Sequence, residues 1–226
     1  AETGKERRMD MLLMEQRRRV VEYSRKMAAE GLSGGTFGNL SLLDRDSGLI
    51  AITPSGMDYF RMEPADIVVV TAGGERVEGE HRPSTELDLH CLLYRSRPDV
   101  GAVVHTHSAF ATVLACLRWD IEPIHYLAAG CGGRVPCIPY LPFGSKELAQ
   151  AAVQAMGKEY QACLLGGHGL LAAGRDLEQA YSAAQQTEFL AQIYYYARLA
   201  GGGVTLTQAE LQDGKERFRT YRSGAD

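Results

Sequence analysis

The stretch "VGAVVHTHSAF", residues 100–110, places two histidines at the end of an apolar run. The run predicts a buried β-strand over 102–107, and side chains two positions apart on a strand project from the same face. His105 and His107 are therefore expected to point the same way, and two imidazoles on one face can bind one metal ion. A buried histidine that is hydrogen-bonded to the backbone is the alternative interpretation of each residue.

A third histidine, His168, interrupts the apolar segment "ACLLGGHGLLAAG", residues 162–174. The glycines on both sides of it would let the backbone approach closely. Three histidines with an open or carboxylate position form a typical catalytic zinc arrangement. His90 lies one helical turn after Glu86, where it either supports such a site or is packed in the core.

The rest of the chain predicts a mixture of strands and helices without a steady β-α-β alternation. Strands are expected over 40–44, 49–53, 102–107 and 162–174, with a hairpin over 66–79 that turns at Gly73–Gly74. Helices are expected over about 9–30, 84–97, 108–117, 145–157, 176–199 and 207–221, with Ser84 or Thr85, Ser145 and Asp176 as N-terminal caps.

These segments predict a single-domain α/β layered fold over residues 1–226, with a mostly antiparallel central sheet flanked by helices. Residues 1–8 are expected to be disordered or foreign to the natural chain, and the tail from about residue 221 is expected to be mobile. The chain has 226 residues of which 45% are hydrophobic, enough for one large core.

Composition also narrows the class of protein. No apolar run reaches the roughly 18–20 residues that cross a bilayer, so no membrane partner is expected. The net charge of −4 argues against a nucleic-acid partner. The five cysteines form no C-x-x-C pair, and their odd number suits reduced thiols in a cytoplasmic protein.

Three short segments have the composition of anion sites. They are "GGTFGN" (34–39) with Thr36, Gly38 and Asn39, "TPSG" (53–56) with Ser55 and Gly56, and "RPSTE" (82–86) with Ser84 and Thr85. Glycine-rich turns expose backbone amides, and a helix N-terminus favours negative charge. Each segment alone is typical of an ordinary turn or cap, but three together favour a phosphorylated ligand.

Two further residues could carry acid–base chemistry. Glu86 directly follows the third segment, where it could act as a base beside the metal or simply stabilise the helix dipole. Tyr126, in "PIHY" (123–126), could donate a proton or be an ordinary half-buried tyrosine.

Taken together, these residues resemble the class II aldolase/adducin family, in particular its zinc-dependent L-fuculose-phosphate aldolases. The resemblance runs from about residue 15 to residue 221. It is carried, in chain order, by "GLSGGTFGNLS", "ITPSGM", "EGEHRPSTE", "RPDVGAVVHTHS", "PIHY", "PYLPFGSKEL", "LLGGHGLLA" and "FRTYR".

The resemblance implies an enzyme that reversibly cleaves a ketose 1-phosphate into dihydroxyacetone phosphate and an aldehyde, in a homotetramer with interfacial active sites. One zinc ion per subunit would be bound by His105, His107, His168 and Glu86, with Glu86 also the proton-transfer base. The phosphate would be held by Gly38, Asn39, Ser55, Gly56, Ser84 and Thr85, with Thr36 nearby. Tyr126 would protonate the aldehyde oxygen, and Phe143 and Tyr221 would shape the aldehyde pocket.

Other functions of the same fold remain open from the sequence. A 5-deoxyribulose-1-phosphate aldolase would share every residue named above, and a methylthioribulose-phosphate dehydratase also uses the H-x-H pattern. A pentulose-phosphate 4-epimerase resembles the chain less, because that branch has Asp at the position of Glu86. A non-catalytic adducin-like module is disfavoured because all three histidines and Glu86 are present.

Overall fold

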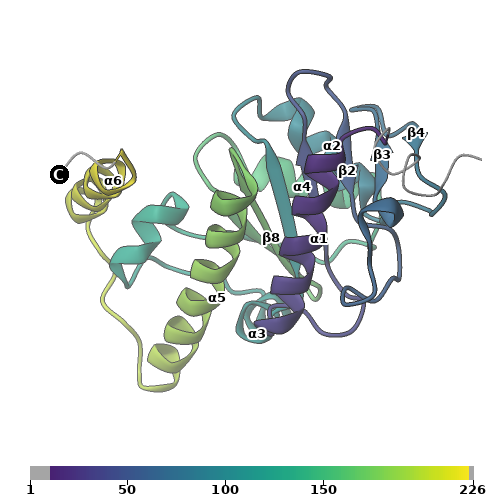
Figure 1. Cartoon of the computed structure of the whole chain (residues 1–226). Coiled ribbons are helices and arrows are strands. Elements are labelled where there is room, and N and C mark those ends of the chain that lie inside the picture. The colour runs from purple at the N-terminus through teal and green to yellow at the C-terminus, as the bar shows by residue number, and fades with distance from the viewer. Residues whose placement is uncertain (1–10, 224–226) are drawn as a thin grey trace, which may run out of the picture.

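The computed structural model describes residues 11–223, with side chains through residue 220, and is built around one eight-stranded sheet (Figure 1). The strands are β1 (Asn39–Leu43), β2 (Ile50–Ile52), β3 (Val68–Val70), β4 (Arg76–Glu78), β5 (Ala102–Thr106), β6 (Cys137–Ile138), β7 (Ala162–Leu165) and β8 (Gly169–Gly174). Their order across the sheet is β4-β3-β2-β1-β5-β8-β7-β6. Only the β6–β7 pair is parallel among these strands, so the predicted, mostly antiparallel sheet is confirmed with one mixed edge.

Helices cover both faces of this sheet, as the predicted layered fold requires (Figure 1). One face packs against α1 (Met14–Ala29), α3 (Ala109–Leu117) and α5 (Leu177–Leu199), and the other against α2 (Leu87–Ser96) and α4 (Lys146–Met156). A short 3-10 helix, η1 (Pro64–Asp66), precedes β3. The C-terminal helix α6 (Gln208–Ser223) is set apart from the sheet and packs against the 3-10 helix η2 (Tyr126–Cys131).

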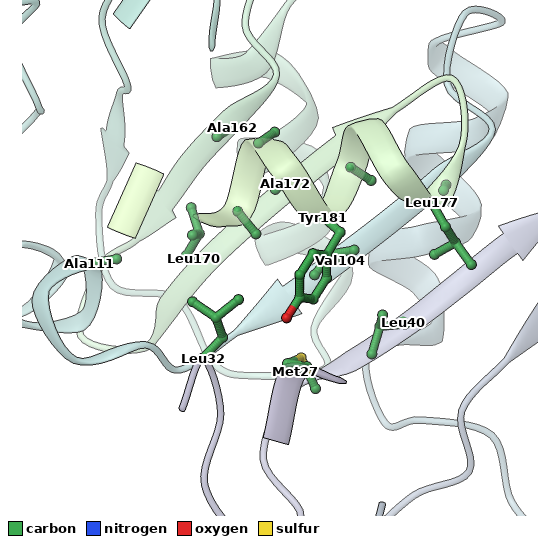
Figure 2. Packing of buried hydrophobic residues seen from close by; sticks show 14 of the residues in the cluster. Met27, Leu32, Leu40, Val104, Ala111, Ala162, Leu170, Ala172, Leu177 and Tyr181 are labelled. Atoms are coloured by element: carbon green, nitrogen blue, oxygen red, sulfur yellow. The ribbon is translucent and has the colours of Figure 1, made fainter. Parts of the chain in front are cut away.

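The central strand β5 contributes to both hydrophobic cores, which explains its uninterrupted apolar run. Val104 packs into the core under α1, α3 and α5, while Val103 faces the core under α2 and α4. Figure 2 shows the first of these cores, where the ring of Tyr181 from α5 lies close to Val104 and Met27. A strand buried on both faces is rigid, so residues at its end are held in a fixed place.

The predicted caps are mostly confirmed, with one correction that concerns the site. Ser145 and Asp176 accept backbone hydrogen bonds at the starts of α4 and α5. Ser84 and Thr85 do not cap α2, because its N-cap residue is Glu86. The Ser84 backbone N–H donates to the Thr53 carbonyl at 3.0 Å, which keeps the chain extended up to this point and delays the helix.

The interrupted strand predicted over 162–174 is a hairpin, because the chain reverses between β7 and β8 at Gly167, which has a φ of +68°.

The expectation for residues 1–8 lies outside the described residues, as does Met9, and α1 begins only at Met14. No helix within residues 11–223 has both the length and the apolar character needed to span a membrane.

Candidate active site

Three histidines from two parts of the chain meet at one end of the sheet. His105 is the penultimate residue of β5, His107 follows that strand, and His168 lies in the turn between β7 and β8. Their nearest ring nitrogens all lie within 4.8 Å of one another, and the Nε2 atoms of His105 and His107 are 2.9 Å apart. The prediction that His105 and His107 share a face is confirmed, and the cluster has the geometry to hold a metal ion.

Glycine at two positions makes this convergence possible. A Cβ atom on Gly169 would collide with the Thr106 carbonyl oxygen and lie 3.4 Å from Cε1 of His105. Gly38 has a φ of +80°, and a Cβ atom there would lie 2.5 Å from the carbonyl oxygen of His105. Only glycine allows such close backbone contact, so both residues bring neighbouring strands tightly against the histidines.

Glu86 completes the cluster from the N-terminus of α2. Its Oε2 lies 3.0 Å from His105 Nε2, and its Oε1 lies 3.5 Å from His168 Nε2. Glu86 Oε1 and His168 Nδ1 are buried and have no hydrogen-bond partner among the described residues. Unpaired buried polar atoms are costly, and a bound cation would satisfy the carboxylate oxygen, so these residues fit a divalent metal ion.

A hydrogen bond behind His105 fixes which of its nitrogens faces the cluster. The Nδ1–H group donates to the Leu170 carbonyl at 2.9 Å, since a carbonyl oxygen can only accept. Nε2 of His105 is therefore the nitrogen with a free lone pair, and it faces His107 and Glu86. Metal-binding histidines in proteins are commonly oriented by such a bond to the backbone.

The electrostatics of the cluster favour ligands in their metal-binding protonation states. Burial opposes ionisation of Glu86, but His105, His168 and the Asn39 hydrogen bond outweigh it and hold the carboxyl pKa below its ordinary value. Burial, together with the neighbouring histidines, lowers the pKa of His107 and that of His168 to about 4. An ionised carboxylate and neutral imidazoles are the forms that bind metal.

A pocket of about 500 Å³ opens beside this cluster and collects most of the predicted site residues. Its lining includes Thr36, Gly38, Asn39, Ser55, Gly56, Ser84, Thr85, Glu86, His107, Phe143 and His168. Three segments far apart in sequence thus line one pocket together with His107 and His168. The fully buried His105 lies behind them.

The side chain of Asn39 is more constrained than the sequence suggested. Its Nδ2 donates to Glu86 Oε2 at 3.0 Å, and its Oδ1 accepts from His90 Nε2 at 2.5 Å. Only its second amide N–H remains for a ligand in the pocket. His90, for which the sequence left two interpretations, is fully buried beside the site.

Aromatic residues form the rim of the pocket, and two of them were not predicted. Phe37 stacks on the His107 ring with centroids 5.7 Å apart, and Tyr140 lines the pocket near Phe143. All three are at least 60% exposed. An aromatic residue inside the glycine-rich loop "GGTFGN" could have indicated Phe37, and the position of Tyr140 in "PYLPFGSKEL", three residues before Phe143, could have indicated Tyr140.

Of the two tyrosines predicted for the site, Tyr126 does not line this pocket within one chain. Tyr126 lies on η2, is 62% exposed, and stacks against Phe218 of α6 with centroids 6.2 Å apart. The side chain of Tyr221 lies outside the described residues, although its backbone belongs to α6.

Several known proteins are similar to this chain over most of its length. A 5-deoxy-D-ribulose 1-phosphate aldolase from Bacillus thuringiensis is 42% identical over 211 residues, which cover 93% of this chain and 99% of that protein. An L-fuculose phosphate aldolase from Escherichia coli is 37% identical, covering 90% of this chain and 94% of its own. A solved structure of an L-fuculose 1-phosphate aldolase superposes with a TM-score of 0.88 at 40% identity, covering 91% of this chain and 96% of that one.

The sequence profile of one family describes most of the chain. Residues 18–195 match the Class II Aldolase and Adducin N-terminal domain, and this range holds the sheet, both cores, the three histidines and Glu86. The chain therefore belongs to the class II aldolase and adducin family.

Proposed function

We propose that this protein is a zinc-dependent aldolase that reversibly cleaves a ketose 1-phosphate into dihydroxyacetone phosphate and an aldehyde. The observation that carries this proposal is the cluster of His105, His107, His168 and Glu86 beside a pocket with three anion-type segments. Aldolases among the similar proteins act on substrates of this class.

The proposed ligands of the ion are the three histidines and Glu86, one ion per subunit. Nitrogen-rich donor sets with one carboxylate suit Zn²⁺ better than Mg²⁺ or Ca²⁺, which prefer oxygen. When bound, the metal supplies a Lewis acid that draws electron density from the substrate carbonyl. A lysine Schiff base is the other common way to stabilise a carbanion, and no lysine lines the described pocket.

The phosphate would lie on the wall formed by Gly38, Ser55, Gly56, Ser84 and Thr85. Ser55, Gly56 and Thr85 are exposed toward solvent, so their polar groups are accessible to a ligand, and Ser84 and Thr85 immediately precede α2, where the helix dipole attracts an anion. A phosphate held there would fix the orientation of the reacting carbon atoms relative to Glu86.

Glu86 would remove the proton from the hydroxymethyl carbon of dihydroxyacetone phosphate in the condensation direction. Its carboxylate is ionised at neutral pH because its pKa is held low, and its Oε1 has no hydrogen-bond partner among the described residues. When substrate displaces Glu86 from the metal ion, this oxygen atom would be available to accept the proton.

The candidate substrates are L-fuculose 1-phosphate and a deoxy-pentulose 1-phosphate such as 5-deoxyribulose 1-phosphate. The second is favoured by the 42% identity to the Bacillus thuringiensis enzyme and by the aromatic rim of Phe37, Tyr140 and Phe143. An apolar rim stabilises the two-carbon aldehyde from 5-deoxyribulose 1-phosphate better than the aldehyde from L-fuculose 1-phosphate, which carries one hydroxyl group.

The proton donor to the aldehyde oxygen would be Tyr126, supplied by a neighbouring subunit of a homotetramer. Two observations support this assignment. Tyr126 is exposed and does not line the pocket of its own chain, and α6 with η2 stands apart from the sheet. Tyr221 would reach the aldehyde pocket in the same way. Buried, reduced Cys91 and Cys163 fit a cytoplasmic location for this assembly.

The decisive experiment is a panel of ketose 1-phosphates assayed for release of dihydroxyacetone phosphate, with and without a chelator. We expect release from at least one substrate, loss of it with chelator, and recovery on adding Zn²⁺. Purified protein with less than about a tenth of a metal ion per chain, unchanged in His107→Ala, would refute the proposal. Size-exclusion chromatography with light scattering tests the tetramer separately.

A further inference from the structure

A continuous chain of buried hydrogen bonds runs from Glu86 into the core between β1 and α2. Asn39 Nδ2 contacts Glu86 Oε2 at 3.0 Å, and Asn39 Oδ1 contacts His90 Nε2 at 2.5 Å. His90 Nδ1 contacts Ser41 Oγ at 2.6 Å, and Ser41 Oγ contacts the hydroxyl of Tyr94 at 2.7 Å. The proposed ligand set and pocket account for Glu86 and Asn39 but leave His90, Ser41 and Tyr94 without a role.

The spacing of these residues follows from the periods of a helix and a strand. Glu86, His90 and Tyr94 are four residues apart and lie on one face of α2. Asn39 and Ser41 are two residues apart and point to the same side of β1. Four helical residues rise about 6 Å and two strand residues about 6.8 Å, so the two rows of side chains stay in register.

The chemistry of the donors and acceptors gives this chain one direction. An ionised carboxylate only accepts, so Asn39 must present its NH₂ group to Glu86 and its carbonyl oxygen to His90. His90 must then donate from Nε2, which leaves Nδ1 as an acceptor for the Ser41 hydroxyl. Ser41 in turn accepts from the hydroxyl of Tyr94.

No solvent competes with these bonds. His90 and Ser41 are 0% exposed, and Asn39 and Glu86 are each 5% exposed. In such surroundings a mismatched donor or acceptor is costly, because water cannot replace the missing partner. If Asn39 turned its carbonyl oxygen toward Glu86, two acceptors would face each other and the carboxylate would be displaced.

We propose that His90 is a positioning residue for Glu86. Through its Nε2–H group it fixes the orientation of the Asn39 amide. Asn39 in turn holds Oε2 of Glu86, while Oε1 stays without a hydrogen-bond partner beside His168. Ser41 and Tyr94 fix His90 in the required tautomer. This inference rests on the proposed role of Glu86 as the base.

The test uses two substitutions that resemble each other in size and polarity. In His90→Gln the amide nitrogen reaches the position of Nε2 and can still donate to Asn39. In His90→Asn the shorter amide reaches only the position of Nδ1, so this donor is lost. Ser24→Ala is the control for the loss of one buried hydrogen bond away from the site. Ser24 is fully buried on α1, and its hydroxyl donates to the Val20 carbonyl.

The first measurement is exchange of the carbon-bound proton of dihydroxyacetone phosphate in D₂O, with metal content and thermal stability measured in parallel. We expect His90→Asn to exchange about 10–100-fold more slowly at saturation, with KM and metal content within about twofold of wild type. His90→Gln should stay within about threefold of wild type, and Ser24→Ala should match it. If the wild type is active and the His90→Asn and His90→Gln variants exchange at equal rates, the role of His90 is refuted but the proposed function is not. If the wild type shows no exchange, the proposed function is refuted.

The second measurement needs no activity. Long-range ¹H–¹⁵N correlation spectra of the purified protein should show His90 as the neutral Nε2–H tautomer, assigned by the loss of its signals in His90→Gln. A neutral Nδ1–H tautomer would overturn the direction of the chain and with it the proposal.

Discussion

The Nε2 atoms of His105 and His107 lie 2.9 Å apart at the end of the central strand β5. His105 offers a lone pair at this point, because its Nδ1–H group is engaged by the Leu170 carbonyl. The two nitrogens can share either one proton or one metal ion. Protons and metal therefore compete for the same place, and the pH of the solution should decide between them.

Acid should destabilise the metal-free protein between pH 6.5 and pH 4. Burial lowers the folded-state pKa of His107 and of His168 to about 4, while an unfolded histidine titrates near 6.5. In this window the unfolded chain binds protons that the folded chain does not, so the free energy of unfolding falls as the pH falls. We expect a loss on the order of 2 kcal/mol for each of the two histidines from pH 7 to pH 5 in urea titrations of chelator-treated protein. His168→Gln should show a shallower slope; an identical slope would contradict the assignment.

Replacing Glu86 with Gln should abolish proton exchange on dihydroxyacetone phosphate while the fold is retained. The amide cannot accept the proton, and general base catalysis of this kind contributes about 10²–10⁴-fold. Exchange in D₂O followed by NMR measures the effect, and circular dichroism checks the fold. Wild-type exchange rates in this variant would exclude Glu86 as the base.

Alanine at Gly38 should be far more damaging than alanine at Gly56. Both glycines have positive φ and line the pocket, but a Cβ atom on Gly38 meets the His105 carbonyl oxygen at 2.5 Å, whereas Gly56 faces open space. We expect Gly38→Ala to lower the free energy of unfolding by about 3 kcal/mol or more, because it displaces β1 from β5. Gly56→Ala should lower it by about 1 kcal/mol, because only backbone strain is added. Urea unfolding compares the two directly, and equal losses would show that β1 can move away without cost.

Glu188 should stabilise the start of α3, and through it the position of His107. Its two carboxylate oxygens accept from the backbone N–H groups of Phe110 and Ala111, each at 2.8 Å, while Ser108 makes no side-chain cap. Glu188→Gln would turn an NH₂ group toward one of these donors. We therefore expect it to lower the free energy of unfolding by about 1–3 kcal/mol and to weaken metal binding. The control is Glu216→Gln on the exposed surface of α6, which should leave both quantities unchanged. Similar stability in the two variants would contradict the capping role.

Phe37 should influence which aldehyde is preferred. It is 60% exposed at the pocket rim and stacks on His107, so its ring can cover an apolar end of the substrate. Phe37→Ala is expected to lower kcat/KM for 5-deoxyribulose 1-phosphate several-fold more than for L-fuculose 1-phosphate. Phe60→Ala, which removes an equally exposed ring outside the pocket, should leave the ratio unchanged. An unaltered ratio in Phe37→Ala would exclude this role.

The order of strands and helices and the meeting of the three histidines could largely be predicted from sequence. The two-residue spacing of His105 and His107 determined their shared direction, because a strand buried on both faces leaves little freedom. The start of α2 could not be predicted, since it depends on the Ser84–Thr53 backbone hydrogen bond, which joins distant segments. As a result, Glu86 is the N-cap residue of α2, in place of Ser84 or Thr85.

The hydrogen bonds of the Asn39 side chain with Glu86 and His90 could not be predicted from the sequence either. A glycine-rich loop ending in Asn suggests a ligand for phosphate, yet Asn39 pairs directly with His105 across β1 and β5 and so faces Glu86. The register that pairs Asn39 with His105, far away in the sequence, sets that contact. Local patterns do not contain such information.

The aromatic rim has a practical consequence for redesigning the catalyst. Phe37, Tyr140 and Phe143 belong to exposed connecting segments, whereas the three histidines lie in or next to strands β5, β7 and β8 and Glu86 is the N-cap of α2. Libraries confined to these three positions can therefore explore new aldehydes in carbon–carbon bond synthesis, while the reacting groups keep the scaffold that holds them.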